Sequence, residues 1–183
     1  MPVLLAVLLY RQDAALPLGV WEAGAVLVIL GVAIRIWAQS HIHHRIGMPM
    51  FLTQTGPYQY VRNPLYLGTT LICAGAVAIS RLPWMVPLTL LWCAVVYSIV
   101  VLHEERTLKE RYGEPYQQYL EKVPRWFPRM RNAGRLDLVN QYTSKAVLAE
   151  VHALLLIFLF PAKGLFLDYG SIIRFGKVWP SLH

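Results

Sequence analysis

The fold follows from the stretch Leu52-Thr53-Gln54-Thr55-Gly56-Pro57-Tyr58-Gln59-Tyr60-Val61-Arg62-Asn63-Pro64-Leu65-Tyr66-Leu67-Gly68, a polar, turn-rich segment between two long apolar ones. Its Gly56-Pro57 pair is a strong turn signal, and Pro64 suits the first turn of a helix. Apolar runs flank it at residues 18–38 and 65–79. A membrane-spanning helix needs roughly 20 mainly apolar residues. Residues 46–63 are therefore expected to form a loop at one membrane face.

The composition is that of a membrane protein. Hydrophobic residues make up 56% of the 183 residues, the mean hydropathy is +0.44 and 15% of residues are charged, against about 25% in a soluble domain. We expect an all-α, polytopic integral membrane protein with one membrane domain over residues 1–183. The net charge of +7 comes mostly from basic residues between and after the apolar runs, which favours anionic lipid over nucleic acid. Cys73 and Cys93 lie inside apolar runs, so neither a disulfide framework nor a zinc site is expected.

Four to five membrane-embedded helical segments are expected. Three are the runs at residues 18–38, 65–79 and 84–102, the first extending into the polar residues that follow it. Two shorter runs, Met1 to Tyr10 and Ala146 to Phe160, either cross fully or lie at the interface. Near the ends of the first run, Glu22 and Arg35 can reach towards water. The glycine pairs seven residues apart, Gly24 with Gly31 and Gly68 with Gly75, allow close helix approach.

The short connection Ser80-Arg81-Leu82-Pro83 predicts an antiparallel helical hairpin over residues 64–102. Its two outer ends then return to the same membrane face. These ends are the loop at 46–63 and the polar run His103-Glu104-Glu105-Arg106. Residues 103–145 carry nine of the seventeen Lys and Arg residues, so the positive-inside rule puts this face in the cytoplasm.

Two motifs resemble the signature of the isoprenylcysteine carboxyl methyltransferases and the related phospholipid methyltransferases. The first runs from Gly56 to Gly68. The second comprises Glu104-Glu105, then Tyr112-Gly113-Glu114-Pro115-Tyr116-Gln117-Gln118-Tyr119, then Val123-Pro124-Arg125-Trp126. The resemblance covers about residues 34–128: the loop 46–63, the hairpin 64–102, and a polar helix with an interfacial segment at 103–128. It implies S-adenosylmethionine-dependent methyl transfer to a lipophilic acceptor, a carboxylate, amine or thiol that arrives from the bilayer. The cofactor pocket would face the cytoplasm.

The expected site follows from the cofactor's carboxylate, ammonium, sulfonium and adenine. Arg62 would hold an anionic group, Glu104 or Glu105 an ammonium or ribose hydroxyl, and tyrosines an adenine or sulfonium. Arg62, Glu104 and Glu105 are the catalytic candidates. The cofactor-binding candidates are Leu52, Thr53, Gly56, Pro57, Tyr58, Tyr60, Arg62, Asn63, Tyr66, Glu104 and Glu105. Arg125 and Trp126 are candidates for a substrate or phosphate contact. No metal is expected; His41, His43 and His44 are read as a polar helix end beside the cofactor.

Other interpretations of these residues stay open. Arg62 alone fits a positive-inside anchor, Glu105 with Lys109 fits a surface ion pair, and the tyrosines fit an interfacial belt. Asn63 stands where the family most often has histidine. The chain also fits an NADPH-dependent membrane reductase related to the sterol reductases, or a non-enzymatic membrane scaffold. Neither the acceptor nor the oligomeric state follows from the sequence.

Overall fold

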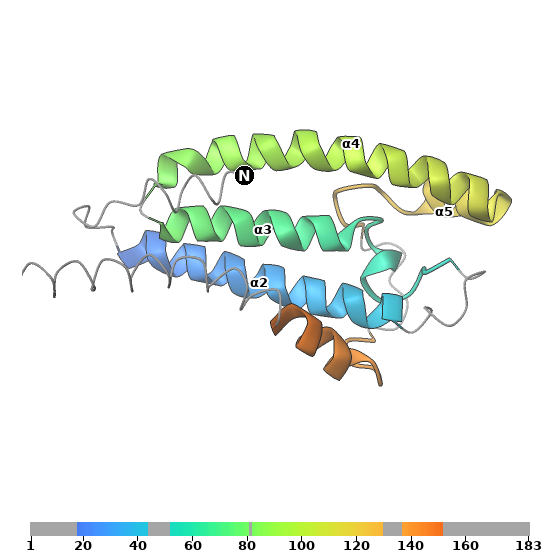
Figure 1. Ribbon diagram of the computed structural model, residues 1–183, viewed down its shortest axis with the longest axis horizontal. Helices are drawn as coiled ribbons and strands as arrows, with labels where there is room; N and C mark the ends of the chain where they lie inside the picture. Colours follow the sequence, from blue (N-terminus) through green and yellow to red (C-terminus); the bar gives the residue numbers. More distant parts are fainter. Residues whose placement is uncertain (1–17, 44–51, 81, 130–136, 152–183) are drawn as a thin grey trace, which may run out of the picture. The chain divides into compact units, whose positions relative to one another are not determined.

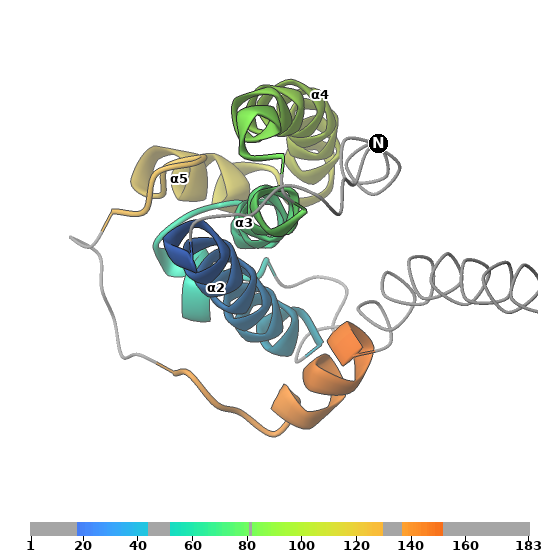
Figure 2. The same ribbon diagram turned by 90° about the vertical axis from the view of Figure 1, so that its left-hand side faces the viewer.

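The computed structural model describes residues 18–43, 52–80, 82–129 and 137–151, and every regular element within them is helical (Figure 1). The chain divides into two compact units, residues 1–147 and 148–183. The helices and the site described below belong to the first unit. Its three long helices lie side by side, with α3 between α2 and α4, as the two views agree (Figures 1 and 2).

Two described helices are long and apolar enough to cross a membrane, fewer than the four to five segments expected. They are α2 (Leu18–His43) and α4 (Val86–Tyr112), while α3 (Pro64–Ile79) is apolar but shorter. Large apolar side chains such as Ile29 and Leu91 are 66% and 63% exposed, which suits contact with hydrocarbon. The apolar run Met1 to Tyr10 and most of the run Ala146 to Phe160 lie outside the described residues.

Helices α2 and α3 pack antiparallel through the two predicted glycine pairs. A Cβ on Gly31 would lie 2.6 Å from the Gly68 carbonyl oxygen, and a Cβ on Gly75 would lie 2.5 Å from that of Gly24. Only glycine lets the two backbones approach so closely. Arg35 lies across Gly68 and donates a 2.6 Å hydrogen bond from Nη1 to Thr69 Oγ1. Arg35 therefore bonds to α3, a contact that the sequence interpretation, in which Arg35 can reach towards water, did not include.

Helices α3 and α4 form the predicted hairpin. Their connection includes the short helix η2 (Pro83–Met85), and a small core of Val77, Leu82 and Met85 closes that end. Near the other end, the rings of Tyr66 and Tyr97 lie 5.0 Å apart. The outer ends of the hairpin thus meet, as the short connection requires.

The polar run at residues 103–106 does not begin a new helix, contrary to the sequence interpretation. Helix α4 continues through it to Tyr112, because these are good helix formers with no Gly or Pro among them. The helix ends at Gly113, whose φ of +57° suits glycine. Helix α5 (Glu114–Lys122) follows and buries Tyr116 and Tyr119 against Val123.

Candidate functional site

The polar loop contains the 3₁₀ helix η1 (Gly56–Gln59), which contacts α2. Gly56 has φ +61°, and a Cβ there would overlap the His41 ring. The ring is buried and lies 3.1 Å from Thr55 Oγ1 through Nδ1 and 3.0 Å from the Asp137 carbonyl oxygen through Nε2. Since a carbonyl only accepts, Nε2 donates to it, and in the neutral imidazole Nδ1 then accepts from the Thr55 hydroxyl. His41 therefore ties helix, loop and residue 137 together.

The second half of the loop is bonded to the chain that follows α5. Arg62 N donates to the Pro124 carbonyl at 3.0 Å, and Arg129 N donates to the Tyr60 carbonyl at 3.1 Å. The Tyr119 hydroxyl donates to the Tyr58 carbonyl at 2.8 Å. These main-chain acceptors and donors fix the loop independently of its side chains.

An ion-pair cluster of Arg62, Glu105 and Arg125 lies at the centre of the site. Arg62 Nη1 donates to Glu105 Oε1 at 2.9 Å, and Arg125 makes a two-pronged contact with the same carboxylate, at 3.1 Å from Nε and 2.5 Å from Nη2. Arg62 also donates from Nε to the Val123 carbonyl at 2.6 Å and from Nη2 to the Leu120 carbonyl at 2.8 Å. All three nitrogens of Arg62 thus serve acceptors within the protein.

Burial strengthens this cluster. Glu105 is 9% exposed, so water and salt screen its attraction to Arg62 and Arg125 less than they would on an open surface. The hydrogen bonds that Arg125 donates to Glu105 raise the pKa of Arg125, which keeps that guanidinium charged. Burial, followed by the Glu105 charge, raises the pKa of the neighbouring Tyr116 to about 12. Burial likewise raises the pKa of Tyr58. Both phenols remain neutral at physiological pH.

Glu104 lies outside this cluster and is exposed. The Tyr66 hydroxyl donates to Glu104 Oε1 at 2.7 Å, so the first turn of α3 holds this carboxylate. Neighbouring glutamates on one helix therefore have different surroundings. The buried Glu105 pairs with both Arg62 and Arg125, whereas Glu104 presents a carboxylate to the outside.

The structure brings most of the predicted site residues together. Asn63 donates to the Arg125 carbonyl at 3.2 Å, and Leu52 packs on the α5 core. Trp126 is half-buried beside Arg125 in the chain, and Thr53 is half-buried next to Leu52. The alternative interpretation, a surface ion pair between Glu105 and Lys109, is wrong. Glu105 is buried and pairs with Arg62 and Arg125 instead.

Sequence reasoning missed three contributors: His41 as a tether of the loop, the carbonyl groups of Leu120 and Val123 as acceptors, and residues 137–140. In the last of these, Asp137 accepts from Trp37 Nε1 at 2.7 Å, and Asn140 Nδ2 donates to the Ser40 carbonyl at 3.3 Å. Main-chain acceptors carry no sequence signal. The polar run at the end of α2 was the only hint of His41. Among described residues, no group of three His, Cys, Asp or Glu side chains is placed to hold a metal ion.

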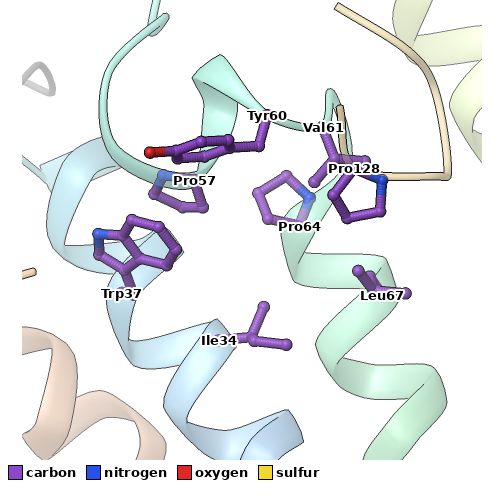
Figure 3. Close-up of a pocket in the computed structure, with 8 residues that line it drawn as sticks. All are labelled: Ile34, Trp37, Pro57, Tyr60, Val61, Pro64, Leu67 and Pro128. Carbon is purple, nitrogen blue, oxygen red and sulfur yellow. The ribbon is translucent and has the colours of Figure 1, made fainter. Parts of the chain in front are cut away.

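An apolar pocket of about 210 Å³ lies where α2, the loop and the start of α3 come together. Helix α2, the loop, the start of α3 and the segment after α5 each contribute to its wall, through Ile34, Trp37, Pro57, Tyr60, Val61, Pro64, Leu67 and Pro128 (Figure 3). The Tyr60 hydroxyl and the Trp37 ring nitrogen lie on the sides of their rings away from the middle of the pocket (Figure 3). The interior therefore presents carbon almost exclusively.

Comparison with known proteins gives a family and distant relatives. The sequence model of the phospholipid methyltransferase family matches residues 20–115. The chain is 28% identical to the nickel-cobalt-cadmium resistance protein NccN of Alcaligenes xylosoxydans xylosoxydans over 60% of its length and 53% of the relative. It is 29% identical to the cobalt-zinc-cadmium resistance protein CzcN of Cupriavidus metallidurans, over 61% of its own length and 53% of the relative. The chain thus spans about half the length of these relatives. No solved structure matches it significantly.

Proposed function

The chain belongs to the phospholipid methyltransferase family, and we propose from this that it transfers a methyl group from S-adenosylmethionine to a lipophilic acceptor arriving from the bilayer. One observation carries the proposal: the two motif-bearing segments meet, with Arg62 Nη1 2.9 Å from Glu105 Oε1. A hairpin that serves only to cross the membrane needs no such junction. The face carrying this junction would lie in the cytoplasm, where the cofactor is dissolved, by the positive-inside argument.

The residues around the junction fit the charged parts of the cofactor. Glu104, exposed and oriented by Tyr66, would pair with the ammonium or a ribose hydroxyl. Arg125 bonds Glu105 through Nε and Nη2, and its side chain is 35% exposed, so Nη1 would hold the carboxylate. The rings of Tyr66 and Tyr97 would lie against the sulfonium or adenine.

Arg62 and Glu105 take a different role from the one the sequence suggested. Both are used within the protein, so we assign them to positioning: they hold the loop, α4 and the segment after α5 in one arrangement. Methyl transfer is an in-line displacement whose main demands are alignment and exclusion of water. A fixed loop meets the first demand.

S-adenosylmethionine would supply the electrophilic methyl carbon. The chain's own residues would then orient the acceptor and, for some acceptors, remove a proton. A carboxylate acceptor needs no base. An amine or thiol must lose a proton, and Glu104 is the exposed carboxylate closest in sequence to the junction. The names of the two relatives concern metal resistance, and among the described residues of this chain no group of three metal-ligating side chains favours metal binding.

Calorimetric titration of the purified protein with S-adenosylhomocysteine, and separately with NADPH, tests the proposal. We expect saturable binding of the first compound only. The Glu104→Gln variant should bind it more weakly, whereas Glu110→Gln, an exposed glutamate on the same helix, should bind it normally. Binding of NADPH alone would favour the reductase. Binding of neither compound by folded protein would favour a non-enzymatic scaffold.

A further inference from the structure

The segment after α5 is fixed near both of its ends, yet it presents its most apolar side chain to the outside. Arg62 N donates to the Pro124 carbonyl at 3.0 Å. Further along the segment, Arg129 N donates to the Tyr60 carbonyl at 3.1 Å. Between these two bonds lies Phe127, which is 85% exposed. Because the backbone on either side is held, the segment displays this ring instead of burying it.

A second segment, bonded to the end of α2, has the same arrangement. The Asp137 carbonyl accepts from Trp37 Nε1 at 2.7 Å, and Asn140 also donates to α2. Leu138 and Val139 lie between these two points and are 58% and 78% exposed. Two fixed segments thus each display large apolar side chains, and such side chains on a membrane protein indicate contact with another apolar phase.

Both segments are attached where the apolar surface of the helices ends. On α4, Leu102 is 47% exposed, and Glu105, which binds Arg125 of the first segment, follows three residues later. At the rise of an α-helix this step is about 4.5 Å along the axis. The second segment is bonded to α2 near the end of the apolar run at residues 18–38. The displayed side chains therefore belong to the level of the membrane interface.

The charge of this part of the chain selects the kind of lipid. Residues 121–145 carry six Lys or Arg residues and two Asp or Glu residues. Among the described ones, Arg129 and Lys145 are exposed. Basic residues beside the bilayer are attracted to anionic headgroups, and aromatic side chains favour the headgroup level. A nucleic acid would offer phosphates but no apolar phase for Phe127.

We propose that the two segments form a docking surface for anionic phospholipid. Phe127, Leu138 and Val139 enter the edge of the hydrocarbon, and Arg129 and Lys145 bind headgroup phosphates. Because the segments are bonded to the loop and to the end of α2, this contact seats the candidate site at the membrane surface. The inference goes beyond the proposed methyl transfer and does not depend on it.

The first arm of the test measures the depth of the displayed side chains. The full chain is reconstituted into nanodiscs of equal parts phosphatidylcholine and phosphatidylglycerol that hold one copy each, so that no second copy can cover the segments. A nitroxide is attached to Phe127→Cys or to Val139→Cys. Both variants also carry Cys73→Ala and Cys93→Ala, which leaves one thiol per chain.

We expect molecular oxygen, which concentrates in hydrocarbon, to relax both labels more than a water-soluble nickel chelate does. Glu110→Cys in the same background is the matched control, because Glu110 is exposed on the polar end of α4. Its label should be relaxed more by the nickel chelate. The same result at Phe127→Cys and Val139→Cys would place these side chains in water and overturn the inference.

The second arm measures the choice of headgroup. Phosphatidylglycerol or phosphatidylcholine is titrated into the protein in an uncharged detergent, and native mass spectrometry gives the Kd of the first bound lipid. We expect phosphatidylglycerol to bind more tightly. Arg129→Gln should weaken its binding about fivefold, the contribution of one basic residue near an anionic surface. Arg111→Gln, an exposed change in the last turn of α4, should leave it unchanged.

The outcomes of the second arm also decide. Equal affinities for the two lipids would show that the surface does not recognise anionic headgroups, which overturns the inference. Equal effects of Arg129→Gln and Arg111→Gln would do the same, because the attraction would then come from the net charge of the protein. Neither arm uses S-adenosylmethionine, so a failure of the proposed function would leave both results standing.

Discussion

Arg62 and Glu105 are 43 residues apart in the sequence, yet Arg62 Nη1 donates a 2.9 Å hydrogen bond to Glu105 Oε1. The bond closes the outer end of the α3–α4 hairpin. Because Arg62 also bonds the carbonyls of Leu120 and Val123, the same side chain fixes the chain after α5. The cluster thus combines an ionic contact with two main-chain contacts, and removal of either partner has consequences beyond the ion pair.

Replacement of Glu105 by alanine should destabilise the protein strongly. It leaves two guanidinium groups facing each other at a site where the Glu105 side chain was 11% exposed. Breaking a buried ion pair from one side costs about 3 kcal/mol, which should appear as a lower thermal midpoint in detergent. Glu110→Ala, an exposed change on the same helix, should alter it little. Equal midpoints for the two variants would mean that the cluster does not hold the fold.

Replacement of Arg62 by lysine should fail to preserve the site although the charge is kept. Lysine has one nitrogen, so it can keep the Glu105 contact or a carbonyl contact but not the three-way fork. We expect a lower thermal midpoint and weaker S-adenosylhomocysteine binding. The exposed Arg106→Lys serves as control. Full binding by Arg62→Lys would show that only the charge at this position matters.

Much of the helical arrangement could be predicted from local signals. The spacing of Gly24 with Gly31 predicted a face for close approach, and Pro64 predicted where α3 begins. The short connection at residues 80–83 predicted that the two polar runs meet, because the outer ends of an antiparallel hairpin return to the same membrane face. Such signals are local in sequence, and tertiary packing did not override them.

The details of the site could not be predicted in the same way. The sequence interpretation ended the third span at Leu102, because the composition turns polar there, but helix propensity continues to Tyr112. It assigned Arg62 to a cofactor because nothing in the sequence marks the Leu120 and Val123 carbonyls as acceptors. His41 was read as part of a polar helix end, since its partner Asp137 is 96 residues away. Long-range partners of main-chain groups have no sequence pattern.

Replacement of Gly68 by alanine should loosen the packing of α2 on α3. The new Cβ would lie 2.7 Å from both the Gly31 carbonyl oxygen and Arg35 Cγ, and the backbone atom cannot move aside cheaply. We expect a loss of about 2 kcal/mol from overpacking. Gly19→Ala makes a matched control, because a Cβ there meets nothing within 4 Å. In that variant the higher helix propensity of alanine should leave stability equal or slightly raised. Thermal midpoints in one detergent decide between these results.

Alkaline pH should destabilise the protein through Tyr116, whose pKa is raised to about 12 from 10.0. Below pH 10 both the folded and the unfolded chain keep this phenol protonated, so it adds no pH dependence. Between pH 10 and 12 the unfolded chain loses the proton while the folded chain retains it, so stability falls as the pH rises. Thermal midpoints between pH 8 and 12 should therefore fall less steeply in Tyr116→Phe. An identical slope in both proteins would contradict the raised pKa.

Replacement of Gly56 by alanine tests the contact between the loop and His41. Alanine at φ +61° is strained, and its Cβ would overlap the imidazole ring. Gly113→Ala is the matched control, because Gly113 also has a positive φ, +57°, but a Cβ there meets nothing within 4 Å. Each variant should lose about 1–3 kcal/mol from backbone strain, and Gly56→Ala should lose more because of the ring.

The decisive comparison adds His41→Ala to each glycine variant. His41→Ala alone should lower the thermal midpoint, since it removes the contacts to Thr55 and Asp137. Combined with Gly56→Ala it should cost less than the sum of the two changes, because the overlap with the ring is gone; combined with Gly113→Ala it should cost the sum. S-adenosylhomocysteine titration of the same variants should show weaker binding for Gly56→Ala and partial recovery in its double variant. Strict additivity in both pairs would mean that His41 does not position the loop through Gly56.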